Sequence, residues 1–170
     1  ASLMMAMAKP TYIAVTQHAD NKPAIVFVPS RKQCKLTAVD LITYCVADDK
    51  AHQFLHCKPE EVVSILERVQ DKSLVETLQH GIGFYHEALS KGDKKIVEQL
   101  FESGAIQVLI ASRDTCWSLP VRSHMVILMG TQYFEGKEHR YVDYPITDVL
   151  QMLGSGCRPL DDETGKCVLM

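Results

Sequence analysis

Short runs of uninterrupted apolar residues recur along the chain, and polar or amphipathic segments separate them. Runs of strand length lie at 24–28, 106–110 and 124–129, and a shorter one lies at 81–85. Because these runs are apolar on both faces, we expect buried strands that other elements cover on each side, as in a mainly parallel sheet. The last residues, 166–170, predict one more apolar strand.

Helical signals lie between these strands. Pro10 suits the first turn of a helix that runs to about residue 19. Ser30 can cap a second helix, in which apolar residues recur at a mostly helical spacing at Leu36, Val39, Ile42 and Val46. Ser90 can cap a third helix that Gly104 ends. A further helix is expected at 146–153.

The order of these elements predicts the fold class. Strand, short loop and helix repeat as βα units, so we expect an α/β fold whose mainly parallel sheet is covered by helices on both faces. Residues 48–80 are more polar and predict helices, one of them opened by Pro59, which form an insertion or lid. No internal repeat or low-complexity tract interrupts the chain, so we expect residues 1–170 to form a single domain.

Composition narrows the class of protein further. The chain has 170 residues, of which 46% are hydrophobic and 23% charged, as is usual for globular domains. Its formal net charge of -3 argues against a generally basic nucleic-acid binder, so any contact with phosphates must be local.

Cysteine spacing and the two ends of the chain indicate where the protein is located and whether the chain is complete. Six cysteines without a Cys-x-x-Cys pair predict reduced thiols and an intracellular location. Residues 3–8 are apolar but too short for a membrane span, so no membrane partner is expected. Because the first residue is not Met and no turn signal follows 166–170, we expect the natural protein to be longer at both ends.

The motifs of a complete nucleotide-hydrolysing enzyme are missing. No Gly-rich loop ends in Gly-Lys-Ser/Thr, the sequence that cradles phosphates and holds magnesium. The acidic cluster at 161–163 follows Pro159 and predicts a solvated turn rather than a metal site. Gly-x-Ser-x-Gly and His-Glu-x-x-His are also absent. The chain by itself should therefore neither bind nor hydrolyse a nucleotide.

Four segments, in order, resemble the motifs of superfamily 2 helicases. Residues 148–159, Asp-Val-Leu-Gln-Met-Leu-Gly-Ser-Gly-Cys-Arg-Pro, resemble motif VI, whose usual form is Gln-x-x-Gly-Arg-x-x-Arg-Pro. Residues 27–31 resemble motif IV, 83–86 motif IVa and 111–120 motif V. A Trp in motif V and Asp-Val-Leu-Gln-Met before motif VI are typical of the Ski2-like branch. The resemblance covers essentially the whole chain and implies the second RecA-like domain of a Ski2-like helicase cassette.

Motif VI is the segment in which the resemblance implies lost chemistry. In the family, two arginines of this motif reach the γ-phosphate of ATP, which the first RecA-like domain holds with Mg²⁺, and accelerate hydrolysis by about 10³-fold or more. Arg158 matches the second arginine, but Ser155 stands where the first belongs. A hydroxyl supplies neither a full charge nor a guanidinium fork. Hydrolysis should be severely impaired, with Gln151 and Arg158 as the candidate nucleotide contacts.

Both nucleotide candidates have structural alternatives. Arg158 could simply pair with an acidic neighbour, and Gln151 could be an ordinary glutamine at an exposed helix end. Ser30 and Arg31 follow the carboxyl end of a buried strand, where ligands bind in open α/β sheets, so they are candidates for RNA-backbone contact. Capping by Ser30 could coexist with that role. Trp117 could stack on a base, but the core or a domain interface is the favoured place for it.

Two further departures from the family pattern point away from translocation. Pro120 replaces the asparagine of the family's Trp-Gly-Val-Asn and removes a backbone donor from motif V. Glu87 in motif IVa would place a carboxylate near a negatively charged strand. We therefore expect a degenerate motor domain.

The resemblance is to spliceosomal members of the branch, and it implies a role in pre-mRNA splicing. We expect a nuclear protein-interaction scaffold and regulator of a neighbouring active cassette. The expected partners are the first RecA-like domain and the remaining helicase domains of the same chain, spliceosomal proteins and RNA. Two alternatives remain open: a catalytically competent, ATP-dependent RNA-unwinding cassette, and a protein-interaction module with no nucleotide role.

Overall fold

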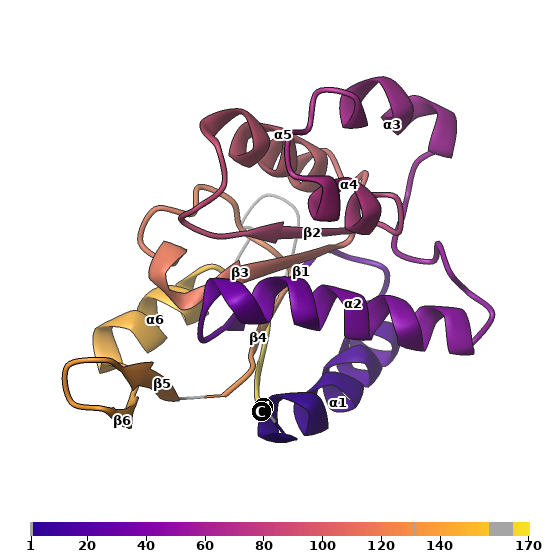
Figure 1. Ribbon diagram of the computed structural model, residues 1–170. Helices are drawn as coiled ribbons and strands as arrows, with labels where there is room; N and C mark the ends of the chain where they lie inside the picture. Colours follow the sequence, from indigo (N-terminus) through magenta and orange to yellow (C-terminus); the bar gives the residue numbers. More distant parts are fainter. Residues whose placement is uncertain (1, 131, 157–164) are drawn as a thin grey trace.

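The computed structural model describes residues 2–130, 132–156 and 165–170 and shows an α/β fold around one parallel sheet (Figure 1). The strands of this sheet are β1 (Ala24–Val28), β2 (Ile82–Tyr85), β3 (Val108–Ser112), β4 (Met125–Leu128) and β7 (Lys166–Leu169). They lie in the order β2-β3-β1-β4-β7, and every neighbouring pair is parallel. The structure thus confirms the strands that the apolar runs predicted.

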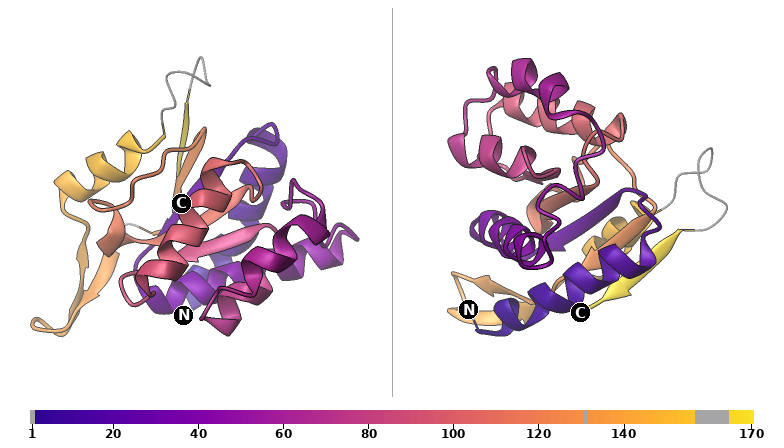
Figure 2. Two further views of the ribbon diagram at one scale, coloured as in Figure 1. Left: turned by 90° about the horizontal axis from the view of Figure 1, so that it is seen from above. Right: turned by 90° about the vertical axis from the view of Figure 1, so that its right-hand side faces the viewer.

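Within the described part of the chain, six α-helices connect and flank the strands. They are α1 (Ser2–His18), α2 (Arg31–Ala47), α3 (Pro59–Leu66), α4 (Lys72–Leu78), α5 (Lys91–Glu102) and α6 (Ile146–Gly154). The chain passes outward from β1 to β2 through α2 and α4 and returns to β3 through α5. Right-handed connections in opposite directions place their helices on opposite faces of the sheet. Accordingly, α2 and α4 cover one face, whereas α5 and α6 cover the other (Figure 2). This is the RecA-like α/β arrangement that the sequence predicted.

Two helical details differ from expectation. Pro10 lies in the middle of α1 and not in its first turn. The helix continues through it, because Ala6, whose carbonyl loses its backbone partner there, is exposed and can be hydrated. In α2, the side chains that face the sheet are Cys34, Thr37, Ala38, Leu41 and Cys45. Three of the residues from which the helix was predicted, Leu36, Val39 and Val46, are exposed instead. Small side chains let α2 approach the sheet closely.

Residues 48–80 contain α3 and α4, as the sequence predicted, and backbone contacts fix this segment to the rest of the domain. The buried Asp93 carboxylate accepts hydrogen bonds from the amides of Gln70 at 2.9 Å and Asp71 at 3.0 Å. Gly81 has a φ of 79°, and a Cβ added there would lie 2.0 Å from the carbonyl carbon of Phe54. Only glycine therefore fits where this segment meets β2.

An exposed antiparallel hairpin was not anticipated from the sequence. Strands β5 (Gln132–Glu135) and β6 (Arg140–Asp143) pair outside the main sheet. The apolar and polar side chains of Gln-Tyr-Phe-Glu alternate imperfectly, which conceals a short strand. Gly136 and Lys137, in the turn between them, were the available signal.

Candidate functional site

The loops that follow β1, β2 and β3 meet at one edge of the sheet. Parallel strands in register place their carboxyl ends side by side, since Phe27 of β1 aligns with Ala111 of β3. Ser30 and Arg31 follow β1, and both are exposed. Ser30 occupies the N-cap position of α2, as expected, but its side chain makes no capping hydrogen bond. Both side chains are thus accessible, and their contact with RNA stays a prediction.

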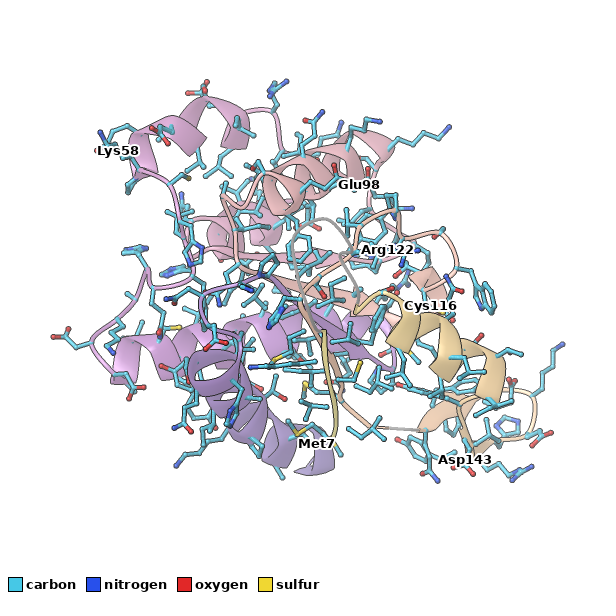
Figure 3. The ribbon with its side chains drawn as sticks, turned by 180° about the vertical axis from the view of Figure 1, so that it is seen from behind. Met7, Lys58, Glu98, Cys116, Arg122 and Asp143 are labelled. Atoms are coloured by element: carbon cyan, nitrogen blue, oxygen red, sulfur yellow. The ribbon has the colours of Figure 1, made fainter. Side chains whose placement is uncertain are left out.

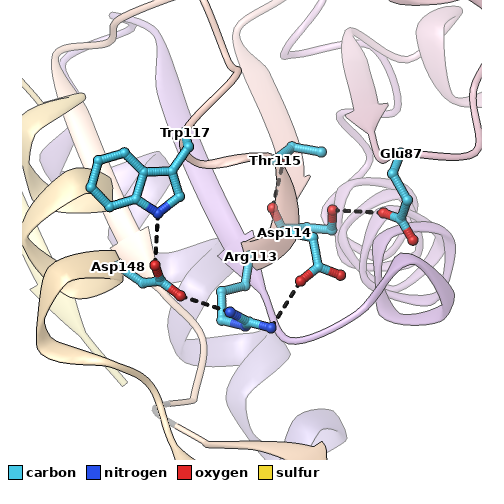
Figure 4. A network of polar contacts seen from close by, with 7 residues as sticks. Glu87, Arg113, Asp114, Thr115, Trp117 and Asp148 are labelled. Carbon is cyan, nitrogen blue, oxygen red and sulfur yellow. Dashed lines mark hydrogen bonds and ion pairs between the residues drawn. The ribbon is translucent and has the colours of Figure 1, made fainter.

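Asp148, on α6, is the centre of a polar network at this edge (Figure 4). Nη1 of Arg113 donates a hydrogen bond to Oδ2 of Asp148 at 2.7 Å, and Nε1 of Trp117 donates to Oδ1 at 2.7 Å. Nη2 of Arg113 also donates to Oδ1 of Asp114 at 2.8 Å. The side chains of Arg113 and Asp148 are only 14% and 12% exposed. A single carboxylate on α6 therefore holds two residues of the motif V segment.

The other side of the Arg113 guanidinium lies against aromatic rings. Its central carbon is 4.0 Å from the centre of the Tyr133 ring and 5.7 Å from that of Tyr144. A guanidinium over an aromatic face is attracted to it electrostatically and packs well. Burial raises the pKa of Tyr144 well above its usual value, so its phenol stays neutral. Arg113 thus ties the end of β3 to the hairpin and to α6.

Trp117 does not lie in the core, which was one of the two places that the sequence favoured for it. Its side chain is 61% exposed, and only the indole N–H is engaged, by Asp148. Tryptophan needs a partner for its N–H, and Asp148 supplies one at the surface. A place at a domain interface stays a prediction.

The neighbouring groups at this edge are neutral or acidic. Ser112 donates a hydrogen bond to Oε2 of the exposed Glu87 at 3.3 Å. His86 stacks on Phe84 with ring centres 5.7 Å apart, and burial lowers its pKa. Burial and the nearby Asp148 carboxylate raise the pKa of Cys116 to about 11, so its thiol stays protonated. His86 is thus an ordinary packed histidine, and no activated nucleophile lies among these groups.

The later residues of motif VI, Gln151 to Ser155, lie toward the opposite end of the strands from Asp148. Helix α6 runs from Asp148, beside the carboxyl ends of the strands, back to Ser155, whose carbonyl accepts a hydrogen bond from the amide of Ser123 just before β4. Ser155 is buried and Gln151 is half-buried. Arg158 and the acidic cluster at 161–163 lie outside the described residues. The expected nucleotide roles of Gln151 and Arg158 stay predictions.

A groove of about 400 Å³ separates this end of α6 from the segment before β4. Gln151, Gly154 and Ser155 line one side of it, and residues 119–122 line the other. Arg122 projects here, and its Nη1 donates to the carbonyl of Gly154 at 3.2 Å (Figure 3). Arg122 was missed from the sequence, because only the packing of this loop against α6 reveals it.

Within residues 2–130, 132–156 and 165–170, no group of three or more His, Cys, Asp or Glu side chains could hold a metal ion. None of the described helices is long and apolar enough to cross a membrane.

Comparison with known proteins finds that the chain is similar to segments of much longer proteins, several of which are named as RNA helicases. No family model matches the chain. It is 54% identical, over 167 residues, to the U5 small nuclear ribonucleoprotein 200 kDa helicase of Homo sapiens, and the match covers 98% of this chain but 8% of that protein. Over 168 residues it is 52% identical to the DExH-box ATP-dependent RNA helicase DExH12 of Arabidopsis thaliana, again 98% of this chain and 8% of the relative. It is 44% identical over 167 residues to the Activating signal cointegrator 1 complex subunit 3 of Danio rerio, of which it spans 11%.

Proposed function

Because this chain is homologous over nearly its whole length to a segment of the U5 small nuclear ribonucleoprotein 200 kDa helicase and other DExH-box RNA helicases, we propose that it is the second RecA-like domain of a C-terminal helicase cassette. In this proposal the cassette is degenerate. It binds spliceosomal proteins in the nucleus and regulates a neighbouring active cassette during pre-mRNA splicing. The name of the human relative supports the spliceosomal part.

Ser155 is the observation that carries the proposal. It ends α6 at the position where the family's motif VI has its first arginine, and it is only 7% exposed. A neutral hydroxyl cannot stabilise the charge that develops on a transferred phosphoryl group as an arginine does. ATP and Mg²⁺ would be held by the first RecA-like domain, so this chain would contribute Gln151, Arg158 and little positive charge. Slow or absent hydrolysis follows.

The carboxyl edge of the sheet supports the loss of translocation. Glu87 is exposed there, and the Asp114 side chain is 50% exposed. Their negative charges oppose the approach of a phosphate backbone to Ser30 and Arg31. RNA contact at this edge would therefore be weak.

Exposed apolar side chains support a role in binding proteins. Leu36, Val39 and Val46 are 47%, 46% and 56% exposed, and their spacing places them on one side of α2. On α6, Ile146 and Leu150 are 70% and 61% exposed. Apolar surface of this kind is typical of sites that another protein covers.

Restoring the missing arginine in the full-length protein tests the proposal. In a degenerate cassette, Ser155→Arg should raise RNA-stimulated ATP hydrolysis, measured by steady-state phosphate release. Ser103→Arg, an exposed serine at the end of α5, is the matched control and should change nothing. Slow hydrogen exchange of the β1 amides in Ser155→Arg would verify that an arginine at this buried position leaves the sheet folded.

Two other outcomes would favour the alternatives. One test uses full-length protein in which the neighbouring cassette is inactivated. If this protein hydrolyses ATP briskly with Ser155 in place, and Ser155→Arg leaves that rate unchanged, the cassette that contains this chain is a competent RNA-unwinding enzyme. If Arg158→Ala leaves the ATP affinity of the cassette intact in calorimetric titration, the domain has no nucleotide role and acts in protein interaction alone.

A further inference from the structure

Helix α2 is apolar on its outer side as well as on the side that packs against the sheet. Leu36, Val39, Thr43 and Val46 follow one another along the outer side, and all four are exposed. We call these four residues the outer stripe. A surface helix normally carries polar residues on its outer side, whereas a helix that is apolar all round is usually buried. The outer stripe therefore has the composition of a surface that another element covers.

The residue types of the outer stripe do not favour helix formation. Val39, Thr43 and Val46 are branched at Cβ, which lowers their helix propensity. Alanine or a long unbranched side chain would stabilise an exposed helix better. The hydroxyl of Thr43 donates a hydrogen bond to the carbonyl of Val39 at 2.9 Å, so it needs no partner from outside α2. The stripe thus contributes most to stability when another molecule removes its methyl groups from water.

The charges at the two ends of α2 run against the dipole of the helix. Lys32 and Lys35 are exposed near its amino end, and Asp48 and Asp49 are exposed just beyond its carboxyl end. Acidic residues stabilise the amino end of a helix and basic residues its carboxyl end, so this order of charges does not stabilise α2 itself. It complements a second helix of ordinary polarity that lies parallel to α2, because the acidic first turn of that helix would meet the two lysines.

Asp40 lies beside the outer stripe, one turn after Leu36. Its side chain is partly buried, and among the described residues its carboxylate accepts no hydrogen bond and forms no ion pair. Burial raises the pKa of this carboxyl group, because water solvates its charge poorly. A lysine or arginine that a partner brings to this position would stabilise the charged form of Asp40.

We propose that the outer stripe is the docking site of an amphipathic helix from a spliceosomal protein, which lies parallel to α2. The apolar side chains of that helix cover the stripe, its acidic first turn faces Lys32 and Lys35, and a basic residue pairs with Asp40. From Leu36 to Val46 the stripe is about 15 Å long, so the docked helix has at least three turns. The spliceosomal origin of the partner rests on the proposed function, whereas the chemistry of the partner follows from α2.

Photo-cross-linking in the assembled protein tests the docking site. A photoreactive amino acid replaces Leu36 or Val46 in the full-length protein, and U5 small nuclear ribonucleoprotein particles that contain it are purified and irradiated. Mass spectrometry then identifies the attached segment. We expect both positions to attach to one amphipathic helix of another protein, which begins with Asp or Glu and carries Lys or Arg farther along. Position 36 should attach nearer to the amino end of that helix than position 46.

Substitutions in α2 test the two parts of the recognition separately. Val39→Asp places a carboxylate in the centre of the stripe and should lower the cross-link yield from position 46 by about tenfold. Val63→Asp is the matched control and should leave the yield unchanged, because Val63 is 54% exposed but lies on α3. Lys35→Glu should also lower the yield, and replacement of the facing acidic residue of the partner by lysine should restore it.

The possible failures separate this inference from the proposed function. If the protein enters no U5 particle, the proposed splicing role is wrong and this inference falls with it. If the protein enters the particle but neither position attaches to such a helix, or both attach to RNA or to another part of the same polypeptide, this inference alone is wrong. Slow hydrogen exchange of the β1 amides shows that each variant is folded, and Lys35→Glu carries the test if Val39→Asp is not.

Discussion

Removal of the Asp148 carboxylate is the sharpest test of the polar network at the carboxyl edge. In Asp148→Ala, the guanidinium of Arg113 loses a charge-assisted hydrogen bond and the Trp117 indole loses its acceptor, both at 2.7 Å. The first bond is worth about 1.5–3 kcal/mol and the second about 0.5–1.5 kcal/mol. We therefore expect the free energy of unfolding to fall by about 2–4 kcal/mol. Each kcal/mol corresponds to about 2–4 °C in Tm for a chain of this size.

Asp114→Ala is the matched control, because Asp114 bonds to the same guanidinium. Its side chain is 50% exposed, and exposed pairs contribute only about 0.2–1 kcal/mol. Urea unfolding of the 170-residue chain, followed by far-ultraviolet circular dichroism, measures both variants. Trp117 is the sole tryptophan, so its fluorescence anisotropy should fall in Asp148→Ala alone, as the indole is released. Equal losses of stability in the two variants would refute the central role of Asp148.

Three further predictions concern the packing around the site. Gly81→Ala and Gly104→Ala both replace a glycine with φ near 80°, but only Gly81 faces backbone at 2.0 Å, so Gly81→Ala should cost about 1–3 kcal/mol more in urea unfolding. Equal losses of stability in the two variants would show that the backbone of Phe54 moves away from the added Cβ at little cost. Asp93→Asn should destabilise the chain by about 1–3 kcal/mol and speed amide exchange at residues 70 and 71, because one of two acceptors is lost. Finally, burial lowers the pKa of His86, so the unfolded chain takes up its proton first as pH falls through 6.5. Stability should decline below that pH, and His86→Gln should reduce the decline in urea midpoints.

Much of the fold could be predicted because its strands are continuous apolar runs. Residues 24–28 read as a buried strand from composition alone, and β1 is fully buried. The orientation of α2 could not be predicted in the same way. Leu36 and Val39 are more hydrophobic than Cys34 and Ala38, yet Cys34 and Ala38 face the sheet. The short distance between α2 and the sheet leaves room only for small side chains there.

The candidate site was only partly predictable for a different reason. Motif resemblance located Ser30, Gln151 and Ser155 in the chain but gave no partners for their side chains. The bond between Trp117 and Asp148 joins residues 31 positions apart, and nothing in local spacing indicates it. Arg122 belongs to no recognised pattern and acquires meaning only from the groove beside α6.

The direction of α6 links two places that sequence reasoning treats separately. The helix has nine residues, about 14 Å in length, and a hydrogen-bonded helix this short behaves as a stiff rod. In its first turn, Asp148 accepts a hydrogen bond from Arg113, and the guanidinium of Arg113 packs against the ring of Tyr133 in the hairpin. A tilt of the hairpin would therefore be transmitted through Arg113 and Asp148 along α6 toward Ser155, which lies by the opposite ends of the strands.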